Sequence, residues 1–236
     1  MTTLTLENTQ ETMMLHKTAV PRRKLDEGIA LLRSDLVDMA DVARCMVADA
    51  MTALQTGDTA LAESVIERDA TVDQLDQSIE AEAIRLVATQ QPVAYDLRFI
   101  GTALKVTTDI ERVGDHAVNI ARTVMRLAQV GKSTPVPLEV TRMGTLALQL
   151  IGSCAEAYSD DNGRVAQQII ERDDDMDVLY REAQSELRGR MRDTPSESVA
   201  ASHLLFVAHY LERIGDHCAN AAERLTFLLT GRVFHS

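Results

Sequence analysis

Several residue types are scarce in this chain of 236 residues. Aromatic residues make up 3% and tryptophan is absent, so platforms for stacking nucleic-acid bases are not expected. With 5 prolines and 11 glycines, the sequence offers few of the turns that a fold of many short strands needs. Its 3 cysteines are widely spaced and form no CxxC pair, which is typical of reduced thiols in a cytosolic protein.

Positive charge and long apolar runs are scarce as well. The 24 Lys and Arg residues against 36 Asp and Glu residues give a net charge of −12, which argues against a nucleic-acid-binding protein. No apolar run approaches the roughly 20 residues of a membrane-spanning helix. The N-terminus lacks a basic segment followed by an apolar one, so no secretory signal is expected. We therefore expect a cytoplasmic protein that does not insert into the membrane and reaches it only through partners.

Apolar residues recur every three or four positions from Leu25 onward, which predicts an all-α fold of six long helices. Gly57 and Asp58 predict a helix end followed by an N-cap, and Gln91-Pro92 predicts a second break. Thr194-Pro195 predicts the capped start of the last helix. The expected helices run from about 25 to 57, 59–90, 94–130, 138–159, from after Gly163 to about 192, and from about 194 to 230.

The two halves of the chain resemble each other. Residues 111–121 align with 212–222 at an offset of 212 − 111 = 101, and seven of the eleven positions are identical. Residues 65–69 align with 169–173 at an offset of 104. An internal repeat of this kind predicts two tandem three-helix bundles. We expect a loose N-terminal arm at 1–20, the first repeat at 21–130, a linker at 131–137 and the second repeat at 138–231.

The third expected helix carries Glu111, Asp115 and Asn119 four residues apart, so their side chains stack on one face. The sixth helix repeats this ladder with Glu212, Asp216 and Asn220. Ladders of carboxylate and amide oxygens suit hard divalent or trivalent cations such as Mg, Mn or oxidised Fe, with Zn as a further candidate. Because the apolar residues of both helices fall on the opposite side, we expect the ladders to face outward or toward a partner.

A second acidic pattern lies on the second and fifth expected helices. Asp69 and Asp73 are four residues apart, as are Asp173 and Asp177. They would complete cation sites if these helices pack beside the ladder helices. The alternative is that all these acids are solvated residues that only aid solubility. The duplicated Gly114 and Gly215 lie mid-helix, where each costs about 1 kcal/mol relative to Ala, and they predict close approach of another backbone or a ligand.

Three segments, at 65–76, 90–121 and 209–223, resemble the PhoU family, whose hallmark here is the tandem ERxGDH sequence. The resemblance covers roughly residues 25–230 and implies a pair of three-helix bundles. It also implies a cytoplasmic, often dimeric, negative regulator of the phosphate regulon. Such proteins act between the phosphate ABC transporter, through its ATPase subunit, and a sensor histidine kinase. The resemblance places metal ions on Glu111/Asp115 and Glu212/Asp216, with the four aspartates of the second and fifth helices matching the family pattern.

Two positions break the internal symmetry. Tyr210 stands where the first repeat has Asp109, and Arg122 stands where the second has Glu223, so we expect the two cation sites to differ in charge. Two other functions stay open from the residues alone: a carboxylate-based metalloenzyme and a metal-free helical scaffold. The sequence shows no nucleophile–base arrangement, and Gly occupies the His position of the Glu-x-x-His di-iron signature, so we expect no enzymatic activity.

Overall fold

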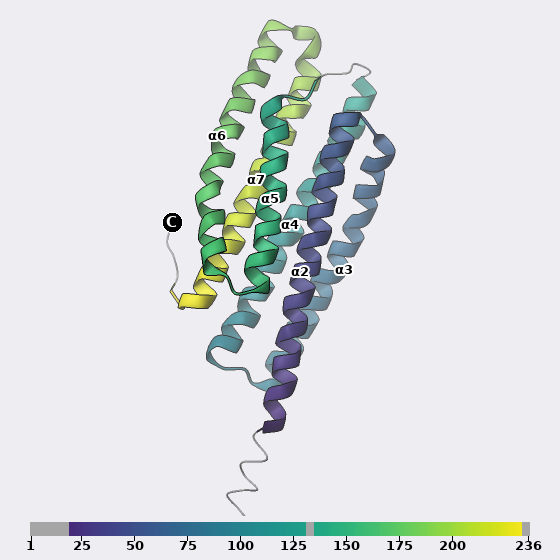
Figure 1. Cartoon of the computed structure of the whole chain (residues 1–236). Helices are drawn as coiled ribbons and strands as arrows, with labels where there is room; N and C mark the ends of the chain where they lie inside the picture. Colours follow the sequence, from purple (N-terminus) through teal and green to yellow (C-terminus); the bar gives the residue numbers. More distant parts are fainter. Residues whose placement is uncertain (1–18, 131–134, 233–236) are drawn as a thin grey trace, which may run out of the picture.

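The computed structural model describes residues 19–130 and 135–232. Within these ranges the chain forms six α-helices and one short 3₁₀ helix, and no strand. The elements are α2 (Ala19–Thr56), α3 (Thr59–Gln90), α4 (Ala94–Val130), α5 (Leu138–Ser159), α6 (Gly163–Asp193), η1 (Pro195–Glu197) and α7 (Ser198–Thr230). The prediction of an all-α fold is confirmed (Figure 1). None of the described helices is long and apolar enough to cross a lipid bilayer.

Most helix ends follow local sequence signals. Gly57 adopts a left-handed φ of 72° directly after α2. The Asp58 side chain then caps α3 by accepting a hydrogen bond from the Leu61 N–H at 3.0 Å. α3 ends at Gln90, and its C-cap residue Gln91 has a φ of 50° and precedes Pro92. These ends confirm the predicted breaks, because each relies on residues within one turn of the helix end.

Two predicted helix starts are wrong. α2 begins at Ala19, ahead of Leu25, and includes Pro21, which is tolerated because the first-turn N–H groups have no intrahelical partner. Thr194 makes no side-chain capping bond. Its backbone N–H instead closes α6 on the Arg190 carbonyl at 2.9 Å, and α7 begins only after η1. Residues 1–18 of the expected arm and 131–134 of the expected linker lie outside the described residues.

The helices pack as two groups of three that share one core. α2, α3 and α4 contact one another, as do α5, α6 and α7. α4 also packs against α7 and α2 against α5, so that α2, α4, α7 and α5 form a ring with α3 and α6 outside it (Figure 1). The predicted apolar faces of α4 and α7 are buried in this core: Phe99, Val106, Ile110, Val113, Ala117, Ile120 and Val124, and Val207, Leu211, Ile214, Cys218, Ala221 and Leu225.

A polar cluster ties the two groups together at the end of α5. Arg33 of α2 forms an ion pair with Asp161 at 2.9 Å and also donates to the Tyr158 carbonyl. Tyr95, at the start of α4, donates to the same Asp161 carboxylate at 2.8 Å. The Arg33 guanidinium lies 4.7 Å from the centroid of the Phe99 ring, in cation–π range. The turn between α5 and α6 is therefore held against the first group of helices.

Candidate functional site

The first candidate site lies where α3 packs against α4. Asp69 and Asp73 of α3 lie beside Glu111 and Asp115 of α4, and we call these four residues the first acidic seam. Burial raises the pKa of Asp69, and the charges of Asp73 and Asp115 raise it further. Burial and the charge of Asp115 likewise raise the pKa of Glu111. The two acidic patterns thus meet in one place, which is the condition for a shared cation site.

The second acidic seam consists of Asp173 and Asp177 of α6 with Glu212 and Asp216 of α7. Burial, followed by the charges of Asp216, Asp177 and Glu212, raises the pKa of Asp173 to about 6. Among the described residues, no donor hydrogen-bonds to the buried Asp173 Oδ1 or Glu212 Oε2 atoms, although His209 Nδ1 lies 3.5 Å from Glu212 Oε2. Burial and the charge of Asp216 also raise the pKa of Glu212. Negative charge that is buried and only partly compensated is what a bound cation would stabilise.

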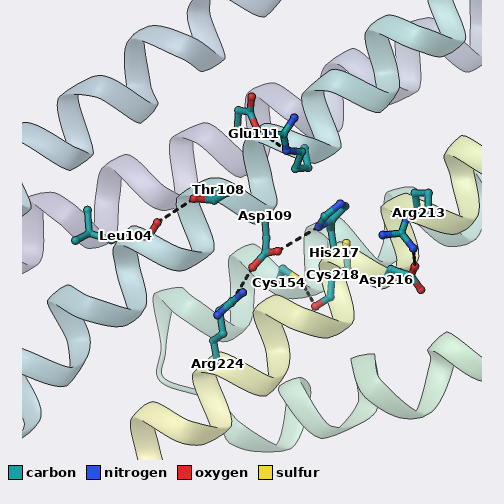
Figure 2. Close-up of polar contacts among 11 residues, drawn as sticks. Leu104, Thr108, Asp109, Glu111, Cys154, Arg213, Asp216, His217, Cys218 and Arg224 are labelled. Atoms are coloured by element: carbon teal, nitrogen blue, oxygen red, sulfur yellow. Dashed lines mark hydrogen bonds and ion pairs between the residues drawn. The ribbon is translucent and has the colours of Figure 1, made fainter. Parts of the chain in front are cut away.

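Each seam also contains an arginine from its own ERxGD sequence. Arg112 Nη1 lies 2.7 Å from Asp115 Oδ2, and its Nε lies 3.3 Å from Glu111 Oε2. Arg213 Nη1 lies 2.6 Å from Asp216 Oδ2, as Figure 2 shows. Among the described residues, no three His, Cys, Asp or Glu side chains are arranged as a ready set of metal ligands. Arg112 and Arg213 thus occupy carboxylate oxygens that a cation would otherwise contact.

The duplicated glycines lie directly under the seams. A Cβ atom at Gly215 would lie 3.2 Å from Asp173 Oδ1 and 3.1 Å from Met176 Cγ. A Cβ atom at Gly114 would lie 3.8 Å from Asp69 Oδ1, and 3.5 Å from its nearest neighbouring atom. The predicted approach of a backbone or a ligand is wrong in its partner, because side chains of α3 and α6 occupy the space beside both glycines. Because glycine has no side chain, Asp69 of α3 can approach α4 and Asp173 of α6 can approach α7.

The ladders are less exposed than the sequence predicts. The Glu111 side chain is 26% exposed and the Glu212 side chain 18% exposed, because α3 and α6 cover this side of α4 and α7. The prediction that the ladders face outward is therefore wrong for these two glutamates. Of the remaining predicted ligands, the exposed ones are Asp73, Asp177 and Asn220, and the half-buried ones are Asp69, Asp115, Asn119, Asp173 and Asp216. Within the described residues, neither asparagine side chain hydrogen-bonds to a seam.

Sequence reasoning missed a further carboxylate at the first seam. Asp76 is half-buried on α3, three residues after Asp73, and its charge raises the pKa of Glu111. Burial and the charges of Glu80 and Asp73 raise the pKa of Asp76 itself. Its spacing from Asp73 places it on the same helical face and was the available signal. At the offset of 104 the second repeat has Tyr180 there, so the two seams differ in charge at this position.

Sequence reasoning also missed a buried polar cluster between the repeats. The Asp109 side chain, 8% exposed, lies 3.2 Å from His217 Nδ1 and 2.7 Å from Arg224 Nε (Figure 2). Its counterpart Tyr210 stacks on His116 with ring centroids 5.8 Å apart. Asp109 and Tyr210 thus differ at the contact between α4 and α7, whereas the charge of Arg122 lowers the pKa of Asp69 in the first seam. That the two cation sites differ in charge stays a prediction.

Comparison with known proteins assigns the chain to a family. The family described as PhoU domain matches residues 36–124 and 140–225. A relative from Clostridium acetobutylicum, named phosphate-specific transport system accessory protein PhoU homolog, is 38% identical over 212 residues, which cover 89% of this chain and 96% of the relative. A protein of the same name from Caulobacter vibrioides is 37% identical over 205 residues, which cover 87% of this chain and 89% of the relative.

Solved structures agree with this assignment. The crystal structure of PhoU from Pseudomonas aeruginosa aligns with a TM-score of 0.84 at 31% identity, covering 88% of this chain and 99% of that one. The phosphate transport system regulatory protein PhoU from Streptococcus pneumoniae aligns with a TM-score of 0.82 at 27% identity, covering 90% of this chain and 100% of that one. With two matching domains, relatives over most of its length and the same fold, the chain belongs to the PhoU family.

Proposed function

We propose that this protein is a non-enzymatic negative regulator of the phosphate regulon and of high-affinity phosphate uptake. It acts as a cytoplasmic adaptor between the ATPase subunit of the phosphate ABC transporter and a sensor histidine kinase. The observation that carries the proposal is similarity over nearly the whole chain to proteins named as accessory or regulatory components of phosphate transport. Proteins that align over nearly their whole length usually share a function.

We further propose that both acidic seams bind divalent or trivalent metal ions, with Mg, Mn, Fe and Zn as candidates. The residue types suit such ions, because in each seam carboxylates from two helices lie close enough to raise the pKa of Asp69 or Asp173, and hard cations prefer oxygen ligands. No three of the described carboxylates form a ready ligand set, so a bound ion would have to draw them together. At the second seam, the buried Asp173 Oδ1 atom, which has no hydrogen-bond partner among the described residues, is the strongest sign of a missing positive charge. A bound ion would offset part of the negative charge of the seam and would present a cation to a protein partner.

Replacing seam carboxylates by amides is expected to remove metal without unfolding the helices. We predict that Glu212→Gln with Asp216→Asn loses the metal held by the second seam, because neutral amides are weaker ligands for hard cations than carboxylates. Inductively coupled plasma mass spectrometry after dialysis measures the metal content, and circular dichroism measures helicity. The double variant Glu111→Gln with Asp115→Asn should do the same at the first seam.

The matched control for both variants is Glu63→Gln with Glu67→Gln, which removes two exposed acids of α3 outside the seams. This control should keep the metal content of the unaltered protein. Equal metal content in all four proteins would contradict the metal proposal, and it would leave the regulatory proposal standing.

Gene deletion tests the regulatory proposal in the host. Deletion should derepress phosphate-starvation genes in phosphate-rich medium, and the unaltered protein should restore repression. Tagged protein should recover the transporter ATPase and the histidine kinase from membranes of phosphate-replete cells. Normal repression in the deletion strain would refute the proposal.

The proposed adaptor is expected to be a homodimer at the cytoplasmic side of the membrane, held there by its partners. Light scattering on the purified protein measures the mass. A mass of 26.0 kDa at all concentrations would contradict the dimer.

A further inference from the structure

A groove with a positive lining lies between α4 and α7, away from both seams. It has a volume of about 370 Å³ and is lined by residues of the first turns of α4 and the last turns of α7. These turns lie in the lower half of Figure 1. Three of its seven lining residues are basic, namely Arg98, Lys105 and Arg224, and one, Glu223, is acidic. A lining with a net charge of 3 − 1 = +2 stands out in a chain with a net charge of −12.

Two of these basic side chains lack a counter-charge. Within the described residues, neither Arg98 nor Lys105 forms an ion pair, whereas Arg224 is paired with Asp109. The Arg98 Nε atom is buried and donates no hydrogen bond. A buried guanidinium N–H without an acceptor is unfavourable, so a turn of the Arg98 side chain that brings this N–H onto a ligand acceptor in the groove would remove a cost.

The floor of the groove leaves room for such a ligand. A Cβ atom at Gly101, which lies between Arg98 and Lys105 on α4, would meet no atom within 4 Å. Arg98 and Lys105 are seven residues apart, which is about 10.5 Å along the helix axis and two turns of the helix. Their side chains therefore lie on the same face of α4 and can contact one anion between them. The volume lies within the range of small-molecule sites, roughly 300–1,000 Å³.

We propose that this groove binds a phosphate group, either as free orthophosphate or as the phosphate of a nucleotide. A phosphate group offers several strong acceptor oxygens, and guanidinium and ammonium groups are the side chains that recognise it best. Arg224 lines the groove and also donates a hydrogen bond to Asp109. A phosphate bound to Arg224 would therefore contact a member of the buried polar cluster between the repeats. The inference goes beyond the proposed function and does not depend on it.

Calorimetric titration of metal-free protein tests the proposal, because metal removal prevents phosphate from binding through ions at the seams. The probes are orthophosphate and ATP. We expect the unaltered protein to bind at least one probe, and Arg98→Gln with Lys105→Gln to weaken binding about tenfold or more, since charge-assisted hydrogen bonds are lost. Gly101→Gln should also weaken binding by filling the floor.

The control is Arg22→Gln with Lys24→Gln, which makes the same change in net charge at exposed positions of α2. It should bind like the unaltered protein. Binding of orthophosphate identifies the free anion as a ligand, and binding of ATP alone identifies the nucleotide. Absence of binding to both probes, or an equal loss in the control, would overturn the proposal. Repression in the host is a separate readout, so failure here leaves the proposed function intact.

Discussion

At the scale of single residues, Asp173 shows how the fold acts on a carboxyl group, because burial and the charges of neighbouring acids raise its pKa. Its pKa of about 6 means that the folded state holds a proton on Asp173 more readily than the unfolded state, where the usual value is 3.8. Its contribution to stability is therefore highest below pH 3.8 and is lost as pH rises toward 6. At neutral pH the metal-free protein is therefore destabilised by the ionised Asp173 carboxylate to the full extent.

We predict that Asp173→Asn stabilises the metal-free protein at pH 7.5 by about 1 kcal/mol, a value reduced because Asp173 is only half buried. The gain should shrink toward zero at pH 4, where Asp173 is protonated in the folded protein. Urea unfolding at both pH values measures the difference. Saturating divalent cation should reverse the order, because only the carboxylate gains from the ion.

Two comparisons keep this test specific. Asp69→Asn changes the equivalent residue of the first seam, and it should give a smaller gain because the positive charge of Arg122 offsets part of the pKa shift there.

Burial lowers the pKa of His116 to about 4, which makes the folded protein less stable as pH falls from 6.5 to 4. Since that effect opposes the effect of Asp173, the difference between variant and unaltered protein is the quantity to compare. No gain at pH 7.5 would contradict the prediction.

At the scale of helices, the repeat supplies a matched pair of glycines. We predict that Gly114→Ala stabilises the protein by about 0.5–1 kcal/mol, because alanine favours the helix and the new Cβ atom finds ordinary contact distances of 3.5 Å or more. Gly215→Ala should be less stable than Gly114→Ala, because its Cβ atom would lie 3.2 Å from Asp173 Oδ1 and 3.1 Å from Met176 Cγ. Thermal unfolding of the two variants measures this, and equal midpoints would refute it.

The helices also show where local patterns predict structure and where they do not. Gly57 and Asp58 act through neighbouring backbone groups, so their roles could be predicted without any tertiary contact. Thr194 has the same kind of sequence signal, yet a 3₁₀ helix stands between it and α7. The faces of α4 and α7 were predicted correctly on their apolar sides. Their acidic sides were not, because a helical wheel of one helix contains no information on α3 or α6.

At the scale of the whole molecule, the repeats share one core through the contacts of α4 with α7 and of α2 with α5. We therefore predict that the protein unfolds in one cooperative step. Asp109→Ala should lower the free energy of unfolding by about 2–3 kcal/mol, because it leaves Arg224 and His217 without their shared partner between the repeats. Urea unfolding followed by circular dichroism measures this change.

The symmetry-related position provides the control. Tyr210→Phe keeps the ring that stacks on His116 and removes only the hydroxyl, so it should change stability by no more than about 0.5 kcal/mol. Equal losses in Asp109→Ala and Tyr210→Phe would contradict the assigned role of the carboxylate. Two separate unfolding steps in the unaltered protein would contradict the shared core.

The sequence by itself determined the helical class, most helix ends, the buried faces of α4 and α7, the internal repeat and the family resemblance. These depend on spacing within one helix or on comparison of one segment with another. Only the tertiary structure decided that the acidic ladders are partly covered, that Asp76 joins the first seam, and that Asp109 pairs with His217 and Arg224. Those features depend on which helix lies against which: Asp76 and Glu111 are 111 − 76 = 35 positions apart, and Asp109 is 108 positions from His217. They meet through packing that no local pattern encodes.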